Sequence, residues 1–208
     1  DLKASSDRAA NLLTRLGVRK GDVVMLLLRR RHEFYTVAFA LAKIGAVYIP
    51  STNQLTAKDI AYRNQAAGVK MIVAWNQDDV LGHVEASLPF SPTVETCVLV
   101  GGRRDGWIDY DGEMEHAPQA WKRPTGSADT TNEDRMIIYF TSGTTSMPKM
   151  AVHSFTYPLG HIVTARYWQQ VQEGGLHLTL ADSGWAKFGW GKLYGQWICG
   201  AVQFVYDM

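Results

Sequence analysis

Short apolar runs alternate along this chain with segments of helical periodicity, and no other feature restricts the fold as strongly. The runs have the length of strands, and they lack the alternating polar residues of a sheet that faces water on one side. Apolar strands that are separated by helices predict a mostly parallel sheet covered by helices on both faces. We therefore expect the α/β class. The runs in the first half of the chain are 23–28, 46–49, 71–75 and 96–100.

Turn and cap residues mark where the intervening helices begin and end. Gly17 and Gly45 each follow a helical pattern, at the position where a helix C-terminus often needs a positive φ. Thr56 and Asp59 have the spacing of a capping box, which predicts a helix that begins there and runs to Gly68.

The composition changes between residues 101 and 134, where glycine, proline and charged residues replace the apolar runs. Such a stretch indicates an irregular connector, so we assign residues 1–134 to a first α/β subdomain that ends in this connector. The alternation then resumes, and we expect residues 135–208 to begin a second α/β subdomain. The elements expected there are a strand at 136–140, a helix around 159–170, a strand at 176–180, a helix around 192–199 and a strand at 201–206.

The composition also argues against several function classes. A chain of 208 residues that is 46% apolar can bury a large core. Its 21 Lys and Arg nearly balance its 20 Asp and Glu, which argues against nucleic-acid binding. No apolar run reaches the roughly 20 residues of a membrane span, the start lacks a signal-peptide pattern, and Cys97 and Cys199 suit buried thiols. We expect a cytoplasmic protein.

The segment Tyr139–Lys149 carries the clearest chemistry. It follows a predicted strand directly, so its side chains are delivered at the carboxyl end of a sheet, where open α/β folds bind ligands. Hydroxyls, a flexible glycine, exposed amides and an ammonium group suit a polyphosphate. These groups belong to Thr141, Ser142, Gly143, Thr144, Thr145 and Lys149. The Walker pattern is absent, which disfavours a P-loop NTPase, and an ordinary polar surface loop uses the same residue types.

The order of these residues resembles the phosphate-binding signature of the acyl-adenylate-forming superfamily, which includes acyl-CoA synthetases, peptide-synthetase adenylation domains and luciferases. Residues 140–145 and 148–149 match its pattern. Ser146 stands where glycine is usual, and we expect it to stiffen the loop slightly. Met150 stands where many members have glycine, and together with His153 it is similar to the medium-chain acyl-CoA synthetase branch.

Two further segments resemble the same superfamily. Residues 21–24 leading to residues 41–50 are similar to a core motif that reads as strand, helix and strand, and they offer no acid, base or nucleophile. The segment Asp182–Trp185 resembles the Asp-x-Gly-Trp segment of acetyl-CoA and medium-chain synthetases, whose aromatic residue borders the acyl pocket. By that resemblance Gly184 and Trp185 line an acyl pocket. The alternative is that Trp185 belongs to the hydrophobic core.

The resemblance implies an AMP-forming acyl-CoA synthetase, an acid–thiol ligase of fatty acid metabolism that acts on a short- or medium-chain acid. Such an enzyme joins the carboxylate to AMP at the expense of ATP with Mg²⁺, releases pyrophosphate, and passes the acyl group to CoA. The resemblance assigns phosphate binding to Thr141, Ser142, Gly143, Thr144, Thr145 and Lys149, with Thr144 and Lys149 catalytic. We also expect that this chain is part of a large N-terminal domain, that it is a poor catalyst alone, and that the whole enzyme could be a homo-oligomer.

Other interpretations stay open. A peptide-synthetase-like adenylation domain that serves a carrier protein would share the phosphate loop, and so would a non-catalytic α/β binding module. The glycines at 189, 191 and 195 have the wrong spacing for a dinucleotide loop. The run Arg29–Arg31 meets either the phosphates of CoA or solvent. The six histidines show no zinc-site spacing, so we expect no resident metal. The partners that the resemblance implies are small molecules, namely the acid, ATP and CoA.

Overall fold

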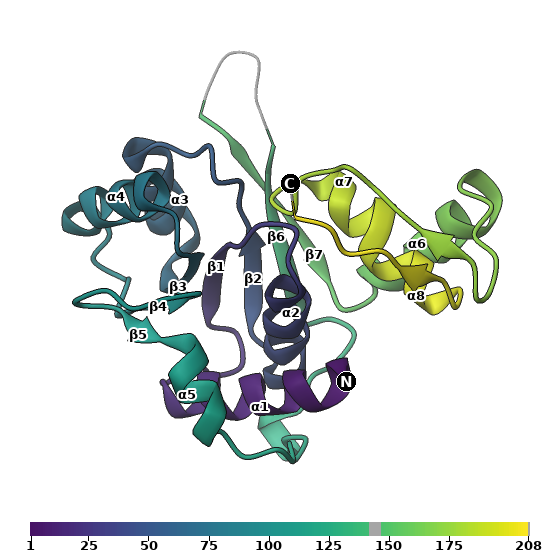
Figure 1. The fold of residues 1–208 in the computed structure, drawn as a ribbon, viewed down its shortest axis with the longest axis horizontal. Coiled ribbons are helices and arrows are strands. Elements are labelled where there is room, and N and C mark those ends of the chain that lie inside the picture. The colour runs from purple at the N-terminus through teal and green to yellow at the C-terminus, as the bar shows by residue number, and fades with distance from the viewer. Residues whose placement is uncertain (142–146, 208) are drawn as a thin grey trace.

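A single seven-stranded sheet forms the centre of the computed structural model, which describes residues 1–141 and 147–207 (Figure 1). The strand order is β5-β4-β3-β1-β2-β6-β7, with parallel pairing throughout except between β6 and β7. This confirms the expected α/β class with a mostly parallel sheet. The strands are β1 Val23–Leu27, β2 Val47–Pro50, β3 Val69–Trp75, β4 Thr96–Val100, β5 Ile108–Asp109, β6 Arg135–Thr141 and β7 Lys149–Ser154.

Helices cover both faces of this sheet. On one face lie α1 (Leu2–Arg15), α2 (His32–Ile44) and α5 (Tyr110–His116), which share one core cluster with the sheet. On the other lie α3 (Ala57–Ala67) and α4 (Asp78–Ser87), which belong to a second cluster. Short 3₁₀ turns follow at Leu88–Phe90 and Gly126–Ala128.

The two clusters explain why the strands read as unbroken apolar runs. In β1, Val24 and Leu26 point into one cluster, whereas Val23 and Met25 point into the other. Neighbouring residues of a strand face opposite sides, so both sides must be apolar when both are covered. Complete burial of an aliphatic side chain contributes about 1.5–3 kcal/mol, so these central strands contribute to stability through both of their faces.

The predicted caps are present. Gly45 ends α2 with φ of 82°, a left-handed conformation in which its backbone N–H donates to the carbonyls of the last helical turn. Gly68 ends α3 in the same way with φ of 64°. Thr56 and Asp59 form the reciprocal capping box at the start of α3. The sequence therefore specifies where both helices stop and where α3 begins.

Several elements differ from those expected. The stretch 101–134 is not wholly irregular, because β5 and α5 lie within it. The helix α4 and the strand β7 were not predicted. The helix α4 nevertheless buries Val80, Leu81 and Val84, whereas every position of β7, at the sheet edge, is exposed or half-buried. The strands β6 and β7 belong to the same sheet as β1–β5. The division of the chain into two subdomains at residue 135 stays a prediction.

The remaining elements form a helical layer beside the sheet edge (Figure 1). They are α6 (Tyr157–Val163), a π-helical turn at Thr164–Trp168, α7 (Ala186–Phe188), a second π-helical turn at Gly189–Leu193 and α8 (Tyr194–Ile198). The expected strands at 176–180 and 201–206 shrink to β8 (Leu176–His177) and β9 (Val202–Gln203), which pair with each other. The expectation of longer strands was wrong.

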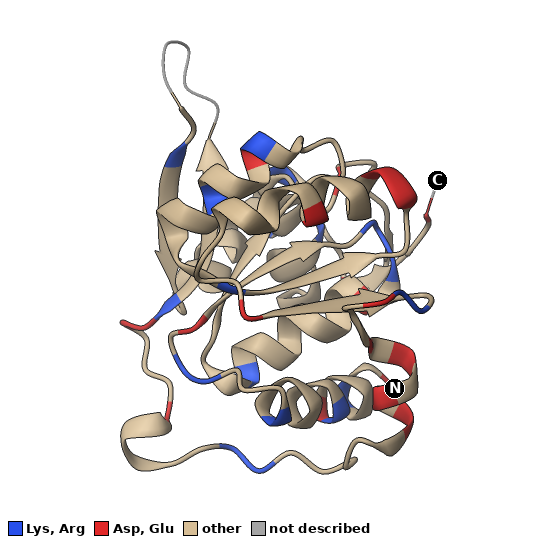
Figure 2. Ribbon diagram, turned by 90° about the vertical axis from the view of Figure 1, so that its left-hand side faces the viewer, with Lys and Arg blue, Asp and Glu red and all other residues tan. Residues whose placement is uncertain are grey.

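Charged residues of both signs are interspersed over the helices and loops rather than gathered by sign, as Figure 2 shows. This distribution fits the near balance of 21 basic and 20 acidic residues. Among the described residues, no helix combines the length and the apolar character needed to cross a membrane.

Candidate active site

A cavity of about 460 Å³ opens at the carboxyl ends of β2 and β6, where ligands bind in open α/β sheets. It brings together two of the segments that the sequence singled out, since Thr141 lines it from one and Gly184 and Trp185 line it from the other. Its wall is completed by residues at the end of β2, by residues of β6, by α3 and by the start of α7. These are Pro50, Ser51, Thr52, Arg63, Tyr139, Phe140, Pro148, Ala186 and Lys187.

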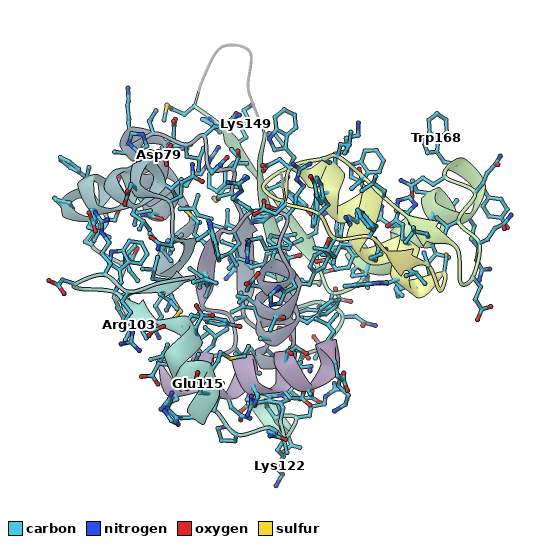
Figure 3. All side chains as sticks on the ribbon, in the orientation of Figure 1. Asp79, Arg103, Glu115, Lys122, Lys149 and Trp168 are labelled. Carbon is cyan, nitrogen blue, oxygen red and sulfur yellow. The ribbon has the colours of Figure 1, made fainter. Side chains whose placement is uncertain are left out.

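The flanks of the proposed phosphate loop form the end of an antiparallel hairpin. Thr141 ends β6 and Lys149 begins β7 directly opposite, and the Thr141 hydroxyl donates to the carbonyl of Lys149 at 3.3 Å. Lys149 is exposed and lies outside the lining of the cavity. Figure 3 shows it at the upper edge of the molecule, where the described part of the hairpin ends. The predicted phosphate ligands Ser142, Gly143, Thr144 and Thr145 lie outside the described residues.

The Asp182–Trp185 segment is fixed as a tight turn against the sheet. The backbone N–H of Gly184 donates to the Asp182 carboxylate at 2.8 Å, and that of Trp185 donates to the Asp182 carbonyl at 3.1 Å. Ser183 is buried, and its hydroxyl donates to the carbonyl of Leu28 just past β1. The turn is therefore tied to the carboxyl end of the sheet through its own polar groups.

Gly184 is required by a close approach of two backbones. A Cβ atom at this position would overlap the backbone nitrogen of Thr52 and the carbonyl carbon of Ser51, which follow β2. Backbone atoms cannot swing aside as the end of a side chain can, so any side chain here would push the turn away from β2. Glycine is what lets Trp185 stand over the end of that strand.

The aromatic residues of this region take different places. Trp185 is 59% exposed, so in the described chain it is a wall residue and not part of the core. Phe188 is 1% exposed and meets Phe34 edge-to-face at 5.2 Å, so it is a core residue. A second cavity of about 410 Å³ shares Trp185, Thr52 and Lys187 with the first. The indole thus borders two adjacent hollows.

Tyrosine hydroxyls lie behind the cavity. Tyr139 lines it, and its ring lies 6.0 Å from that of Tyr157. The hydroxyls of Tyr48 and Tyr194 share a hydrogen bond in the same buried cluster. Burial raises the pKa of Tyr139 well above its ordinary value, so its hydroxyl stays neutral. The ring of His153 lies 4.3 Å from that of Tyr157. His153 is therefore part of this aromatic packing.

Sequence reasoning missed two cations that line the cavity, Arg63 and Lys187. No carboxylate is among the described lining residues, so the charge of the wall is positive. Arg63 sits on a helix far from the motif in sequence, and no motif marks it. Lys187 lies two residues after Trp185, the end of the Asp182–Trp185 turn. This closeness in sequence was the signal that could have marked Lys187 as a lining residue.

The Arg29–Arg31 run holds the end of the described chain to the sheet. Arg29 Nε and Arg31 Nη1 donate to the two carboxylate oxygens of Asp207 at 2.8 and 3.3 Å. Arg30 donates to the carbonyl of Leu180 at 2.8 Å, and the guanidinium of Arg31 lies 3.7 Å from the ring centre of Trp75. The run is thus engaged in structural contacts, and a role toward CoA stays a prediction.

Known proteins resemble this chain over nearly its whole length. The family described as "AMP-binding enzyme" matches residues 1–207. The human mitochondrial acyl-coenzyme A synthetase ACSM4 is 35% identical over the whole chain, and mouse ACSM5 is 36% identical. The chain spans 35% of the length of each of these relatives.

Solved structures match the fold. The anthranilate CoA ligase AuaEII in complex with anthranoyl-AMP superposes with a TM-score of 0.91 at 22% identity, over 100% of this chain and 39% of its own. The acyl-CoA synthetase of Brucella canis superposes with a TM-score of 0.83 at 22% identity, over 98% of this chain and 36% of its own.

Proposed function

Since the chain belongs to the AMP-binding enzyme family, we propose that the polypeptide carrying it is an AMP-forming acyl-CoA synthetase. A carboxylate oxygen attacks the α-phosphorus of ATP, pyrophosphate leaves, and the thiol of CoA then displaces AMP to give the thioester. One observation carries the proposal: a single cavity adjoins both the flank of the phosphate loop at Thr141 and the Gly184–Trp185 turn. A nucleotide phosphate and an acyl group could meet there.

The phosphate side of the reaction needs positioning and charge stabilisation more than a protein nucleophile. Thr141, Ser142, Gly143, Thr144 and Thr145 supply hydroxyl and amide donors to the polyphosphate. Lys149 neutralises charge that develops as pyrophosphate leaves, and Thr144 is the hydroxyl assigned to the same step. ATP carries Mg²⁺ to the site as part of the substrate, and no carboxylate of the described cavity wall competes for it.

The acid side of the site is assigned to the turn. The indole of Trp185 forms an apolar wall that is open to the cavity, and Gly184 allows it to approach the end of β2. The resemblance of this segment to acetyl-CoA and medium-chain synthetases favours a short- or medium-chain acid. We assign the protein to fatty acid metabolism and to the cytoplasm, although the named relatives ACSM4 and ACSM5 are mitochondrial. A homo-oligomer remains part of the proposal.

Product analysis tests the proposed function. The whole polypeptide is incubated with ATP, Mg²⁺, CoA and each acid from acetate to octanoate, and AMP and acyl-CoA are quantified by liquid chromatography and mass spectrometry. We expect equal amounts of the two products. Adenylate formation without any thioester, even at saturating CoA, would instead support an adenylation domain that serves a carrier protein.

A further inference from the structure

Arg63 has surroundings unlike those of an ordinary surface arginine. It lies on α3 and lines the cavity together with Thr141 and Trp185. Its Nε atom is buried, and it donates no hydrogen bond in the described part of the chain. Asp59, one helical turn earlier, acts on it only through space, because the Asp59 carboxylate accepts hydrogen bonds from Thr56.

Contacts on both flanks of the phosphate loop fix the position of this side chain. The guanidinium carbon of Arg63 lies 5.2 Å from the ring centre of Phe140, the residue before Thr141. The hydroxyl of the neighbouring Tyr62 donates to the carbonyl of Pro148 at 2.9 Å. Two consecutive residues of α3 therefore contact residues on either side of the phosphate loop, Phe140 before it and Pro148 after it. These contacts hold the guanidinium next to the end of β6.

The charge of Arg63 has an acidic neighbour in Asp59, but the buried Nε has no hydrogen-bond acceptor among the described residues. Burial lowers the pKa of the guanidinium, but arginine remains protonated at any physiological pH. A buried N–H without a hydrogen-bond acceptor costs free energy, and the Nε of Arg63 is such a group among the described residues. Lys187 adds a second positive charge to the same wall, which includes no carboxylate among the described residues. A phosphate bound in this cavity would face both cations.

We propose that Arg63 binds phosphate oxygens of ATP during adenylate formation, an assignment that rests on the proposed function. A guanidinium presents parallel N–H donors that match two oxygens of a phosphate, which a lysine cannot do. The phosphates are favoured over the carboxylate of the acid because Arg63 contacts Phe140 at the flank of the loop. The acid is assigned to the opposite wall, at Trp185.

The test uses Arg63→Met and Arg63→Lys in the whole polypeptide. Arg8→Met is the matched control, since Arg8 on α1 also has a buried Nε without a partner among the described residues but does not line the cavity. Acid-dependent exchange of pyrophosphate into ATP gives KM values for MgATP and for the acid. Calorimetric titration with inorganic pyrophosphate gives a binding constant that does not need turnover.

Loss of a charge-assisted contact of about 1.5–3 kcal/mol should raise the KM for MgATP, and the Kd for pyrophosphate, about ten- to hundredfold in Arg63→Met. Arg63→Lys should recover part of the loss, and the KM for the acid should stay within about twofold of the parent. Arg8→Met should behave as the parent does in every assay.

Two results would overturn the assignment. A raised KM for the acid with an unchanged KM for MgATP would place the guanidinium on the carboxylate. A lower Tm with unchanged KM values and an unchanged pyrophosphate Kd would make Arg63 a structural support of Phe140. If the parent itself shows no exchange, the proposed function fails separately, and the pyrophosphate titration still decides the role of Arg63.

Discussion

At the scale of single residues, Gly184 and Trp185 shape the cavity in different ways. Because Gly184 has no side chain, its backbone lies close to the backbone that follows β2. This close approach places the exposed indole of Trp185 at the wall of the cavity. The identity of Trp185 as a wall residue could be proposed from the sequence, but the choice between wall and core could not. That choice depends on where the fold places the indole, which lines a cavity together with residues at the end of β2 and with Arg63 of α3.

Trp185→Gly should shift the preference of the enzyme toward longer acids. The indole borders both adjacent cavities, so its removal joins their space, and each additional methylene of the acid gains up to about 0.8 kcal/mol on burial. The measurement is kcat/KM for the straight-chain acids from acetate to octanoate. Phe188→Leu serves as the control, because Phe188 is a core residue that does not line either cavity.

The alternative for Trp185 makes a different prediction. A large aromatic residue in a closed core costs about 3–5 kcal/mol when it is truncated. A variant that melts far lower than the parent yet ranks the acids as the parent does would show that Trp185 supports the fold and does not limit the acyl group.

Lys149→Ala should slow adenylate formation while leaving the fold intact. Lys149 is exposed at the first position of β7, so its side chain contributes little to packing. A charge-assisted contact to phosphate is worth about 1.5–3 kcal/mol, which corresponds to about a ten- to hundredfold loss of rate. The rate of pyrophosphate exchange and the Tm are measured together, and an unchanged rate would remove Lys149 from the proposed site.

At the scale of elements, the sequence predicted those that are buried on both sides. The strands β1 to β4 and the caps of α2 and α3 follow from apolar runs, glycines and the Thr56–Asp59 spacing. The strand β7 was missed because an edge strand with exposed side chains lacks an apolar run. At 176–180 a buried strand was predicted, but only Leu176 and His177 form a strand. The side chains of Leu176, Leu178 and Leu180 are exposed in the described chain.

The capping box of α3 gives a prediction for one element. Thr56→Ala should destabilise the protein by about 1 kcal/mol, because it leaves a backbone N–H of the first helical turn without its acceptor. Thr125→Ala is the control, since Thr125 also precedes a helical turn but makes no side-chain cap. Urea denaturation of both variants is the measurement, and equal midpoints would contradict the role given to the cap.

The same cap has a consequence for acid stability. The hydrogen bond from Thr56 lowers the pKa of the Asp59 carboxylate, so the folded state favours its charged form. A lowered pKa in the folded state adds stability above the ordinary pKa of aspartate, and this stability is lost as the pH falls through the folded pKa. The difference in the free energy of unfolding between the parent and Thr56→Ala should therefore become smaller as the pH falls below the ordinary pKa of aspartate.

At the scale of the whole molecule, the two parts of the chain differ in how well they cover their apolar surface. The sheet and its helices bury nearly all of theirs, whereas residues 157–206 expose many large apolar side chains. An exposed apolar face of this kind is typical of an interaction surface. The curated relatives are much longer than this chain, which spans 35% of their length. The activity proposed here accordingly belongs to the whole polypeptide.

The central claim is that this cavity activates a carboxylate with ATP, and pyrophosphate exchange tests it most directly. Labelled pyrophosphate is incubated with ATP, Mg²⁺ and the whole polypeptide, with and without a straight-chain acid. Formation of an acyl adenylate is reversible, so label should enter ATP only when the acid is present, and Lys149→Ala should slow that entry. Label entering ATP at the same rate without acid, or no entry with any acid from acetate to octanoate, would contradict the account.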